Sequence, residues 1–103
     1  MTGGKISGNS AQTGGGVYSY TDGVDLQAGE ITDNTAYDLG GGVYSEGNAD
    51  YYSTLNMQNA LITGNTATEQ GGGLWFCATG ETTVHEAEGA GIFGNTADKA
   101  GDD

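Results

Sequence analysis

Apolar residues in this chain occur in short runs that alternate with polar residues. Val24-Asp25-Leu26 and Leu55-Asn56-Met57 are examples, and such alternation is typical of a strand with one buried face. No segment places apolar residues at positions i, i+3, i+4 and i+7, and the 21 glycines disfavour long helices. Gly, Asn and Asp turn signals bound the runs. The pattern therefore predicts an all-β fold of short strands.

These runs belong to a unit that recurs along nearly the whole chain. The unit consists of isoleucine, two further residues, asparagine, Ser or Thr, and alanine. After a gap of two or three residues, a triple glycine follows with an aliphatic and an aromatic residue. The asparagines at positions 9, 34, 65 and 95 are 25, 31 and 30 residues apart. A fixed period of this size indicates stacked repeats. We therefore expect a parallel β-helix, or β-solenoid, whose coils stack about 4.8 Å apart.

We expect each coil to contain three short strands. The first is the GGGVY segment, the second is the alternating run exemplified by Val24–Ala28, and the third ends at the asparagine. Residues 1–103 then form a single β-helix segment that comprises a partial coil, 1–13, and three full coils, 14–39, 40–70 and 71–100. The chain begins inside a third strand and stops one glycine into another coil. We therefore expect it to be a piece of a longer solenoid.

Equivalent residues of successive coils should lie directly above one another and form ladders. One interior ladder is predicted to contain Ile6, Ile31, Ile62 and Ile92, and a polar ladder to contain Asn9, Asn34, Asn65 and Asn95. We expect each asparagine to be a turn residue, since asparagine tolerates a left-handed backbone, and to pass amide hydrogen bonds from coil to coil. The triple glycine should allow positive φ angles or a close approach of two backbones.

The repeat resembles a known family at two motifs. Gly40-Gly41-Gly42-Val43 and Ile31-Thr32-Asp33-Asn34 are similar to the paired G-G-A-[ILV] and F-x-x-N motifs of polymorphic outer-membrane proteins, with Gly for Ala and Ile for Phe. The resemblance extends over roughly residues 3–101 and also includes the adhesin-like repeats of large surface proteins from anaerobic bacteria. It implies a right-handed parallel β-helix in an extracellular or cell-surface protein. It further implies a non-catalytic scaffold for display or adhesion, whose partner is a host or microbial surface glycan or protein.

The charge of the chain limits its partners. Fourteen acidic residues against Lys5 and Lys99 give a formal net charge of −12. This charge argues against binding to nucleic acid or anionic membranes, which require basic patches. No apolar run approaches the length of about 20 residues that spans a membrane, so we expect no membrane insertion by this segment. The composition suits a secreted surface, and open solenoid ends would permit weak self-association.

Aromatic residues carry the alternative functional hypothesis, a carbohydrate-binding module. Tyr18, Tyr44 and Trp75 occupy equivalent positions in three coils and could form one outer aromatic face. Tyr51 and Tyr52 lie in the longest insertion, where solenoids often carry binding surfaces. The competing interpretation is structural. Stacked aromatics stabilise neighbouring strands by about 0.2–1 kcal/mol per pair, and the inserted tyrosines could simply cover the coil.

Metal binding is predicted at one turn only. Asp22 and Asp25 flank Gly23, and calcium is bound by oxygen ligands of this kind, but it needs six or more of them. A solvated turn is the default interpretation of these residues, and calcium binding is the alternative. No cofactor other than calcium is indicated, because the single cysteine, Cys77, and the remote His85 are too few for a zinc site.

No catalytic residue can be assigned. Polysaccharide lyases of the β-helix fold resemble this chain in architecture and typically use calcium with an Arg or Lys base, yet the chain has no Arg. Hydrolases need convergent carboxylates, and Asp33 has no partner in other coils. Ice binding would require two parallel hydroxyl ranks. Ser10, Thr35, Thr66 and Thr96 supply one rank, but Phe93 interrupts the second.

Overall fold

The computed structural model describes residues 1–48, 50, 53–76, 80–84, 89–99 and 101–103. These residues form an all-β fold without helices, and every strand pair is parallel. The strands are β1 (Thr2–Ser7), β2 (Ser10–Ala11), β3 (Val17–Tyr20), β4 (Gly23–Thr32), β5 (Thr35–Ala36), β6 (Val43–Glu46), β7 (Ser53–Thr63), β8 (Thr66–Ala67), β9 (Leu74–Phe76), β10 (Gly80–Val84), β11 (Gly91–Phe93) and β12 (Thr96–Ala97).

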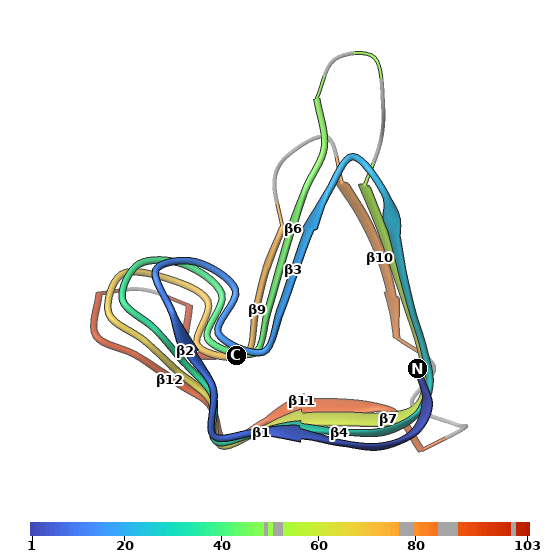
Figure 1. The fold of residues 1–103 in the computed structure, drawn as a ribbon, viewed down its shortest axis with the longest axis horizontal. Coiled ribbons are helices and arrows are strands. Elements are labelled where there is room, and N and C mark those ends of the chain that lie inside the picture. Colours follow the sequence, from blue (N-terminus) through green and yellow to red (C-terminus); the bar gives the residue numbers. More distant parts are fainter. Residues whose placement is uncertain (49, 51–52, 77–79, 85–88, 100) are drawn as a thin grey trace.

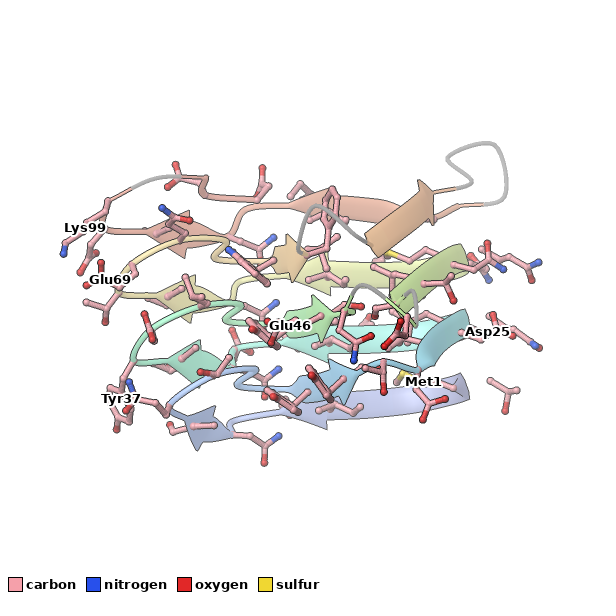
Figure 2. All side chains as sticks on the ribbon, turned by 90° about the horizontal axis from the view of Figure 1, so that it is seen from above. Met1, Asp25, Tyr37, Glu46, Glu69 and Lys99 are labelled. Carbon is pink, nitrogen blue, oxygen red and sulfur yellow. The ribbon has the colours of Figure 1, made fainter. Side chains whose placement is uncertain are left out.

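The strands are arranged in three sheets, each built from equivalent strands of successive repeats. One sheet has the order β1-β4-β7-β10 with β11 also paired to β7, the second has the order β12-β8-β5-β2, and the third has the order β3-β6-β9. Figure 1 shows successive repeats following nearly the same path, and Figure 2 shows the layers stacked on one another. The predicted all-β fold with parallel stacking is confirmed; its handedness and coil number stay predictions.

The strand of two residues lies in a side lobe of each repeat. This side lobe comprises residues 10–13, 35–39, 66–70 and 96–99, and in Figure 1 it projects away from the three long sides of the path. Ala36 and Ala67 are fully buried within it, whereas Thr66 and Thr96 are exposed. Alternation of side chains along each short strand produces this difference between its two positions.

The predicted interior ladders are confirmed by the strand register. Ile6, Ile31, Ile62 and Ile92 are successive partners, as are Val17, Val43 and Leu74. The buried core contains Leu26, Ile31, Val43, Leu55, Met57, Ala60, Ile62 and Ala90. Complete burial of a side chain such as Ile62 contributes about 1.5–3 kcal/mol. Because each ladder buries its members between the repeats above and below, the repeats stabilise one another.

The placement of the strands differs from the prediction of three short strands per coil. The predicted second and third strands are one continuous strand, β4 or β7, because pairing in register runs from Gly23 to Thr32. Figure 1 shows these strands passing around a corner of the path. The residues between the predicted second and third strands, which include Gly29, therefore lie within one paired strand that bends. Besides this long strand and the strand after the triple glycine, each repeat contains the two-residue strand that follows the asparagine.

The predicted backbone of the asparagines is also wrong. The positive φ angle belongs to the preceding residue, which is Gly8, Asp33, Gly64 or Gly94, with φ between 57° and 70°. The left-handed residue turns the chain, and the asparagine that follows directs its side chain inward. Glycine adopts this conformation without steric cost, and Asp is among the few other residues that tolerate it.

The left-handed backbone at Gly64 makes a side chain costly there. Gly64→Ala should lower the free energy of unfolding by about 1–2 kcal/mol, because an L side chain at φ of 70° is strained. A Cβ atom there would also lie 2.9 Å from Asp33 Oδ1. Urea denaturation measures the change.

The matched variant is Asp33→Gly at the equivalent position. Because it relieves backbone strain while making the unfolded chain more flexible, we expect a net change within about 0.5 kcal/mol. In the double variant Asp33→Gly/Gly64→Ala the contact with Asp33 Oδ1 is gone, so the backbone strain at residue 64 and a contact with Thr32 Oγ1 at 3.2 Å remain. Equal stability of Gly64→Ala and the parent chain would contradict the assignment of the turn.

Candidate functional site: the aromatic stack

Three aromatic side chains form a stack on the outer face of β3, β6 and β9. Register pairs Tyr18 with Tyr44 and Tyr44 with Trp75, while the preceding residue of each strand turns to the interior. The rings of Tyr18 and Tyr44 have centroids 5.1 Å apart at an interplanar angle of 9°, and those of Tyr44 and Trp75 are 4.7 Å apart at 6°. The stack follows directly from parallel, in-register pairing.

The members of the stack differ in exposure. Tyr44 is 6% exposed because a ring covers each of its faces, whereas Tyr18 is 57% exposed. The phenol of Tyr44 donates a hydrogen bond to Glu46 Oε2 at 2.5 Å. Residues 44 and 46 lie on the same face of β6 because strand side chains alternate. The sequence pattern indicated the stack but gave no signal for this hydrogen bond.

A cavity lies next to each end of the stack. One has a volume of about 280 Å³ and is lined by Trp75, Phe76, Leu74 and Gln70, among others. The other has a volume of about 330 Å³ and is lined by Tyr18 together with Val17, Val24 and Leu26. Small planar ligands could therefore reach the end rings. The central ring, in contrast, is already covered.

The structure brings together three of the five residues predicted to bind a glycan. Tyr18, Tyr44 and Trp75 stack with their faces against one another, so only the two end rings have a face that no other ring of the stack covers. Tyr51 and Tyr52 lie outside the described residues. A carbohydrate site therefore stays a prediction, and its geometry would depend on Tyr18 and Trp75.

Of the two predicted calcium ligands, Asp22 lies in the turn between β3 and β4, and Asp25 lies near the start of β4. The Asp25 carboxylate accepts a hydrogen bond from Gln27 Nε2 at 3.0 Å. The backbone oxygen of Asp22 accepts hydrogen bonds from the hydroxyls of Ser19 and Ser53, at 3.4 and 3.1 Å. Among the residues that the structure describes, no group of three or more His, Cys, Asp or Glu side chains could hold a metal ion. Calcium binding stays a hypothesis, and a solvated turn stays the default interpretation.

We expect that calcium does not change the melting temperature of the chain. Two carboxylates supply fewer oxygens than the six or more that calcium requires. Differential scanning calorimetry with calcium and with EDTA tests this expectation. A calcium-dependent rise in melting temperature that disappears in the double variant Asp22→Asn/Asp25→Asn would instead demonstrate a site.

Two buried serines near this turn were not predicted. Ser45 and Ser53 are almost completely buried, and their hydroxyls form a short contact. Ser19 is the register partner of Ser45 on β3. The recurrence of serine two positions after the inward valine is the sequence signal that would have placed Ser19 and Ser45 in the interior, but it does not extend to Ser53.

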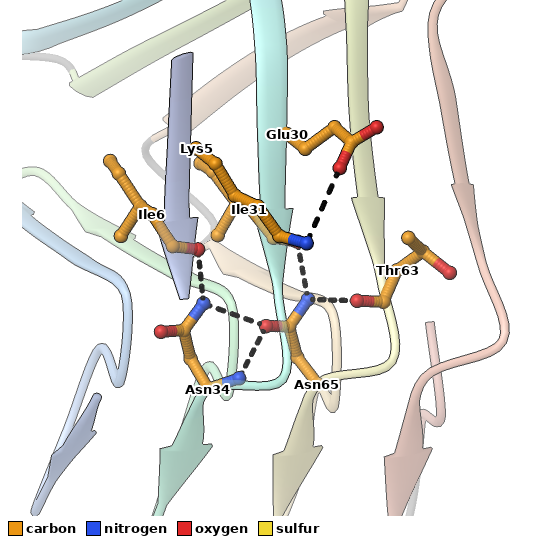
Figure 3. Close-up of polar contacts among 7 residues, drawn as sticks. All are labelled: Lys5, Ile6, Glu30, Ile31, Asn34, Thr63 and Asn65. Atoms are coloured by element: carbon orange, nitrogen blue, oxygen red, sulfur yellow. Dashed lines mark hydrogen bonds and ion pairs between the residues drawn. The ribbon is translucent and has the colours of Figure 1, made fainter. Parts of the chain in front are cut away.

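The predicted asparagine ladder is confirmed. In each repeat the backbone N and the Nδ2 of the asparagine both donate to the Oδ1 of the next asparagine, from Asn9 to Asn34, Asn65 and Asn95, at 2.9–3.1 Å. Nδ2 also donates to a backbone oxygen of the preceding repeat, as Asn34 does to Ile6 and Asn65 does to Ile31. Figure 3 shows Asn34 directed at Asn65, with Ile6 beside them.

One aspartate, Asp103, extends this ladder in a way that the sequence did not predict, and its neighbour Asp102 bonds to the adjacent strand β12. Asp103 Oδ1 accepts from the backbone N and the Nδ2 of Asn95 at 3.0 and 3.1 Å, the same arrangement that links two asparagines. Asp102 Oδ1 accepts from the backbone N of Ala97 at 3.0 Å. The sequence contained one signal for these contacts. Gly101-Asp102-Asp103 aligns with the triple glycines of the earlier repeats, so the two aspartates occupy the positions of the second and third glycine.

Two ion pairs connect neighbouring repeats on the surface. Lys99 lies 2.8 Å from Glu69, and Lys5 lies 3.8 Å from Glu30. The hydrogen bond with Glu69, followed by the charge of that carboxylate, raises the pKa of Lys99 above its ordinary value. The pair therefore persists into alkaline solution and is lost as the pH rises through the raised pKa. Because both partners are exposed, it stabilises the fold only slightly.

The geometry defines a repetitive all-β protein whose equivalent residues form ladders through parallel sheets. Residues 59–76 match the family model of the Chlamydia polymorphic membrane protein repeat. This segment includes Ile62, Asn65 and the triple glycine that begins at Gly71, so the match confirms the resemblance inferred from these motifs. No curated protein and no solved structure matches the chain.

Within the described ranges, no helix is long and apolar enough to cross a membrane.

Proposed function

We propose that this chain is a non-catalytic structural or display segment of a bacterial, adhesin-like protein at the cell surface. It would fold as a right-handed parallel β-helix with about three full coils and a partial one. The observation that carries this proposal is the match of residues 59–76 to a polymorphic membrane protein repeat. That segment contributes Ile62 and Asn65, which are both completely buried in the ladders.

The distribution of polar groups supports a structural role. Asn34 and Asn65 are buried and bonded to the repeats on either side of them. Asp33, a candidate for acid–base chemistry, is exposed on a turn. A general acid or base must converge with a second group on the substrate. The polar side chains of the repeat instead connect one layer to the next.

Surface labelling tests the location. Antibodies raised against the 103-residue chain should label intact cells of the source bacterium as strongly as permeabilised cells. An antibody against a cytoplasmic protein should label only the permeabilised cells. Labelling that requires permeabilisation would contradict a surface role. Cleavage of polygalacturonate that is lost in Asp33→Ala would contradict the non-catalytic assignment.

A carbohydrate-binding module is the second candidate, and the exposed ring of Tyr18 together with the cavity beside Trp75 favours it. If sugars stack on the end rings, glycan-array binding should be lost in Tyr18→Ala or Trp75→Ala. Tyr37→Ala is the matched control, since Tyr37 is 61% exposed and belongs to the side lobe. Equal binding by all of the variants would exclude the stack as the glycan site.

A further inference from the structure

We propose that the aromatic stack is a one-electron relay, in which Tyr44 and Glu46 receive an oxidising equivalent that first arrives at Trp75. This is an activity separate from display or glycan binding. It rests on three features of the stack, which are the ring spacing, the burial of its central member and the carboxylate bonded to that member.

The ring spacing provides the electronic contact. Trp75 and Tyr44 are nearly parallel with centroids 4.7 Å apart, and Tyr18 continues the stack at 5.1 Å. At this separation the π systems of adjacent rings are in van der Waals contact, which favours electron transfer between them. Tyr44 therefore has an electron acceptor, the oxidised indole, directly on its face.

The hydrogen bond to Glu46 provides the path for the proton. A phenol gives up an electron far more readily when its proton can leave at the same time. The Tyr44 hydroxyl already donates to Glu46 Oε2 at 2.5 Å. Tyr44 is also 6% exposed, so the resulting phenoxyl radical would be shielded from solvent reductants and from other protein molecules.

The relay reaction balances in two steps. A one-electron oxidant, for example the azide radical, takes one electron from the Trp75 indole and is reduced to azide. The indole radical cation then takes one electron from Tyr44 while the phenol O–H bond breaks and its proton passes to Glu46. The products are azide, intact Trp75, a neutral Tyr44 phenoxyl radical and a protonated Glu46.

Pulse radiolysis with azide radicals tests this proposal on the whole chain. Trp75 is the single tryptophan, so the transient indole-radical absorption reports on this residue alone. We expect it to decay by a first-order process that is independent of protein concentration, while the phenoxyl absorption rises at the same rate. In Tyr44→Phe, which keeps a ring in the stack but removes the phenol, this phase should be lost.

Two further variants separate the relay from a purely structural stack. Glu46→Gln keeps a hydrogen-bond acceptor but is a much weaker base, so transfer should be slowed several-fold at an unchanged melting temperature. Tyr37→Phe alters an exposed tyrosine outside the stack and should leave the rate unchanged. Decay of the indole radical in Tyr44→Phe at the parent rate, or decay that depends on protein concentration, would overturn the proposal.

Discussion

Asn65→Ala is expected to lower the free energy of unfolding by about 4 kcal/mol, a large share of the stability of a small domain. The amide of Asn65 donates to Ile31 O, Thr63 O and Asn95 Oδ1, and it accepts from the backbone N and the Nδ2 of Asn34. Alanine removes all of these contacts, in which the two N–H groups of the amide share three acceptors, at a residue that is 0% exposed. Each buried polar group left without a partner costs about 1–3 kcal/mol.

Thermal and urea denaturation, followed by circular dichroism, measure this effect. A loss of about 4 kcal/mol corresponds to a decrease of roughly 20 °C in the melting temperature of a domain of this size. Asn65→Asp adds a sharper comparison, because it keeps the shape of the side chain but presents acceptors where the structure requires donors. At neutral pH this variant should be at least as unstable as Asn65→Ala.

Asn9→Ala is the matched control. Asn9 belongs to the same ladder and has the same sequence context, but it is exposed, and its amide donates only to Ser7 O and Asn34 Oδ1. Water can replace these bonds, so we expect a cost of about 1 kcal/mol or less. If Asn65→Ala and Asn9→Ala were equally destabilising, burial within the ladder would not be the source of the effect.

The sequence was sufficient to predict the stacking of equivalent residues. Ile31, Ile62 and Asn65 recur with one period, and a shift of a single residue would turn every interior side chain outward. The repeat therefore determines the register without further information. The aromatic stack could be anticipated for the same reason, since Tyr18, Tyr44 and Trp75 each follow the inward residue of an equivalent strand.

The bends and turns could not be predicted with the same success. The second strand was predicted to end at Ala28, yet it continues through Gly29, which is paired with Ala60 of β7. The left-handed position was assigned to asparagine, which commonly adopts that conformation, whereas Gly64 and Asp33 adopt it. Local propensity describes what a residue tolerates. Here the inward hydrogen bonds of the ladder decided which of two neighbouring residues turns the chain.

The candidate site was predictable in its members but not in its chemistry. Sequence spacing placed three aromatic residues on one face. It did not show that the rings cover one another, that Tyr44 is buried or that Glu46 accepts its hydrogen bond. These properties depend on side-chain rotamers, which a repeat period does not specify. A sugar platform and a closed stack therefore have the same sequence pattern.

Gly41→Ala is expected to lower the free energy of unfolding by about 3 kcal/mol through steric overlap. A Cβ atom at this position would overlap with two backbone oxygens, Thr66 O and, in the coil that follows, Gly72 O. Gly41 does not have a positive φ angle, so the cost comes from crowding rather than from backbone strain. Backbone oxygens cannot rotate away as side chains do. The two repeats would have to separate, which weakens the hydrogen bond from Gly41 N to Gly71 O.

The matched control for this variant is Gly3→Ala. A Cβ atom at Gly3 would have no neighbouring heavy atom within 4 Å, so we expect a change within about 0.5 kcal/mol. Gly15→Ala repeats the test in another layer, where a Cβ atom would lie 2.5 Å from Gly41 O and 2.6 Å from Thr35 O. Urea denaturation measures the free energy of unfolding of all three variants, provided that the m-value is the same in each. Stability of Gly41→Ala equal to that of Gly3→Ala would mean that the repeats do not approach closely at the triple glycine, and the stacked register would lose one of its main supports.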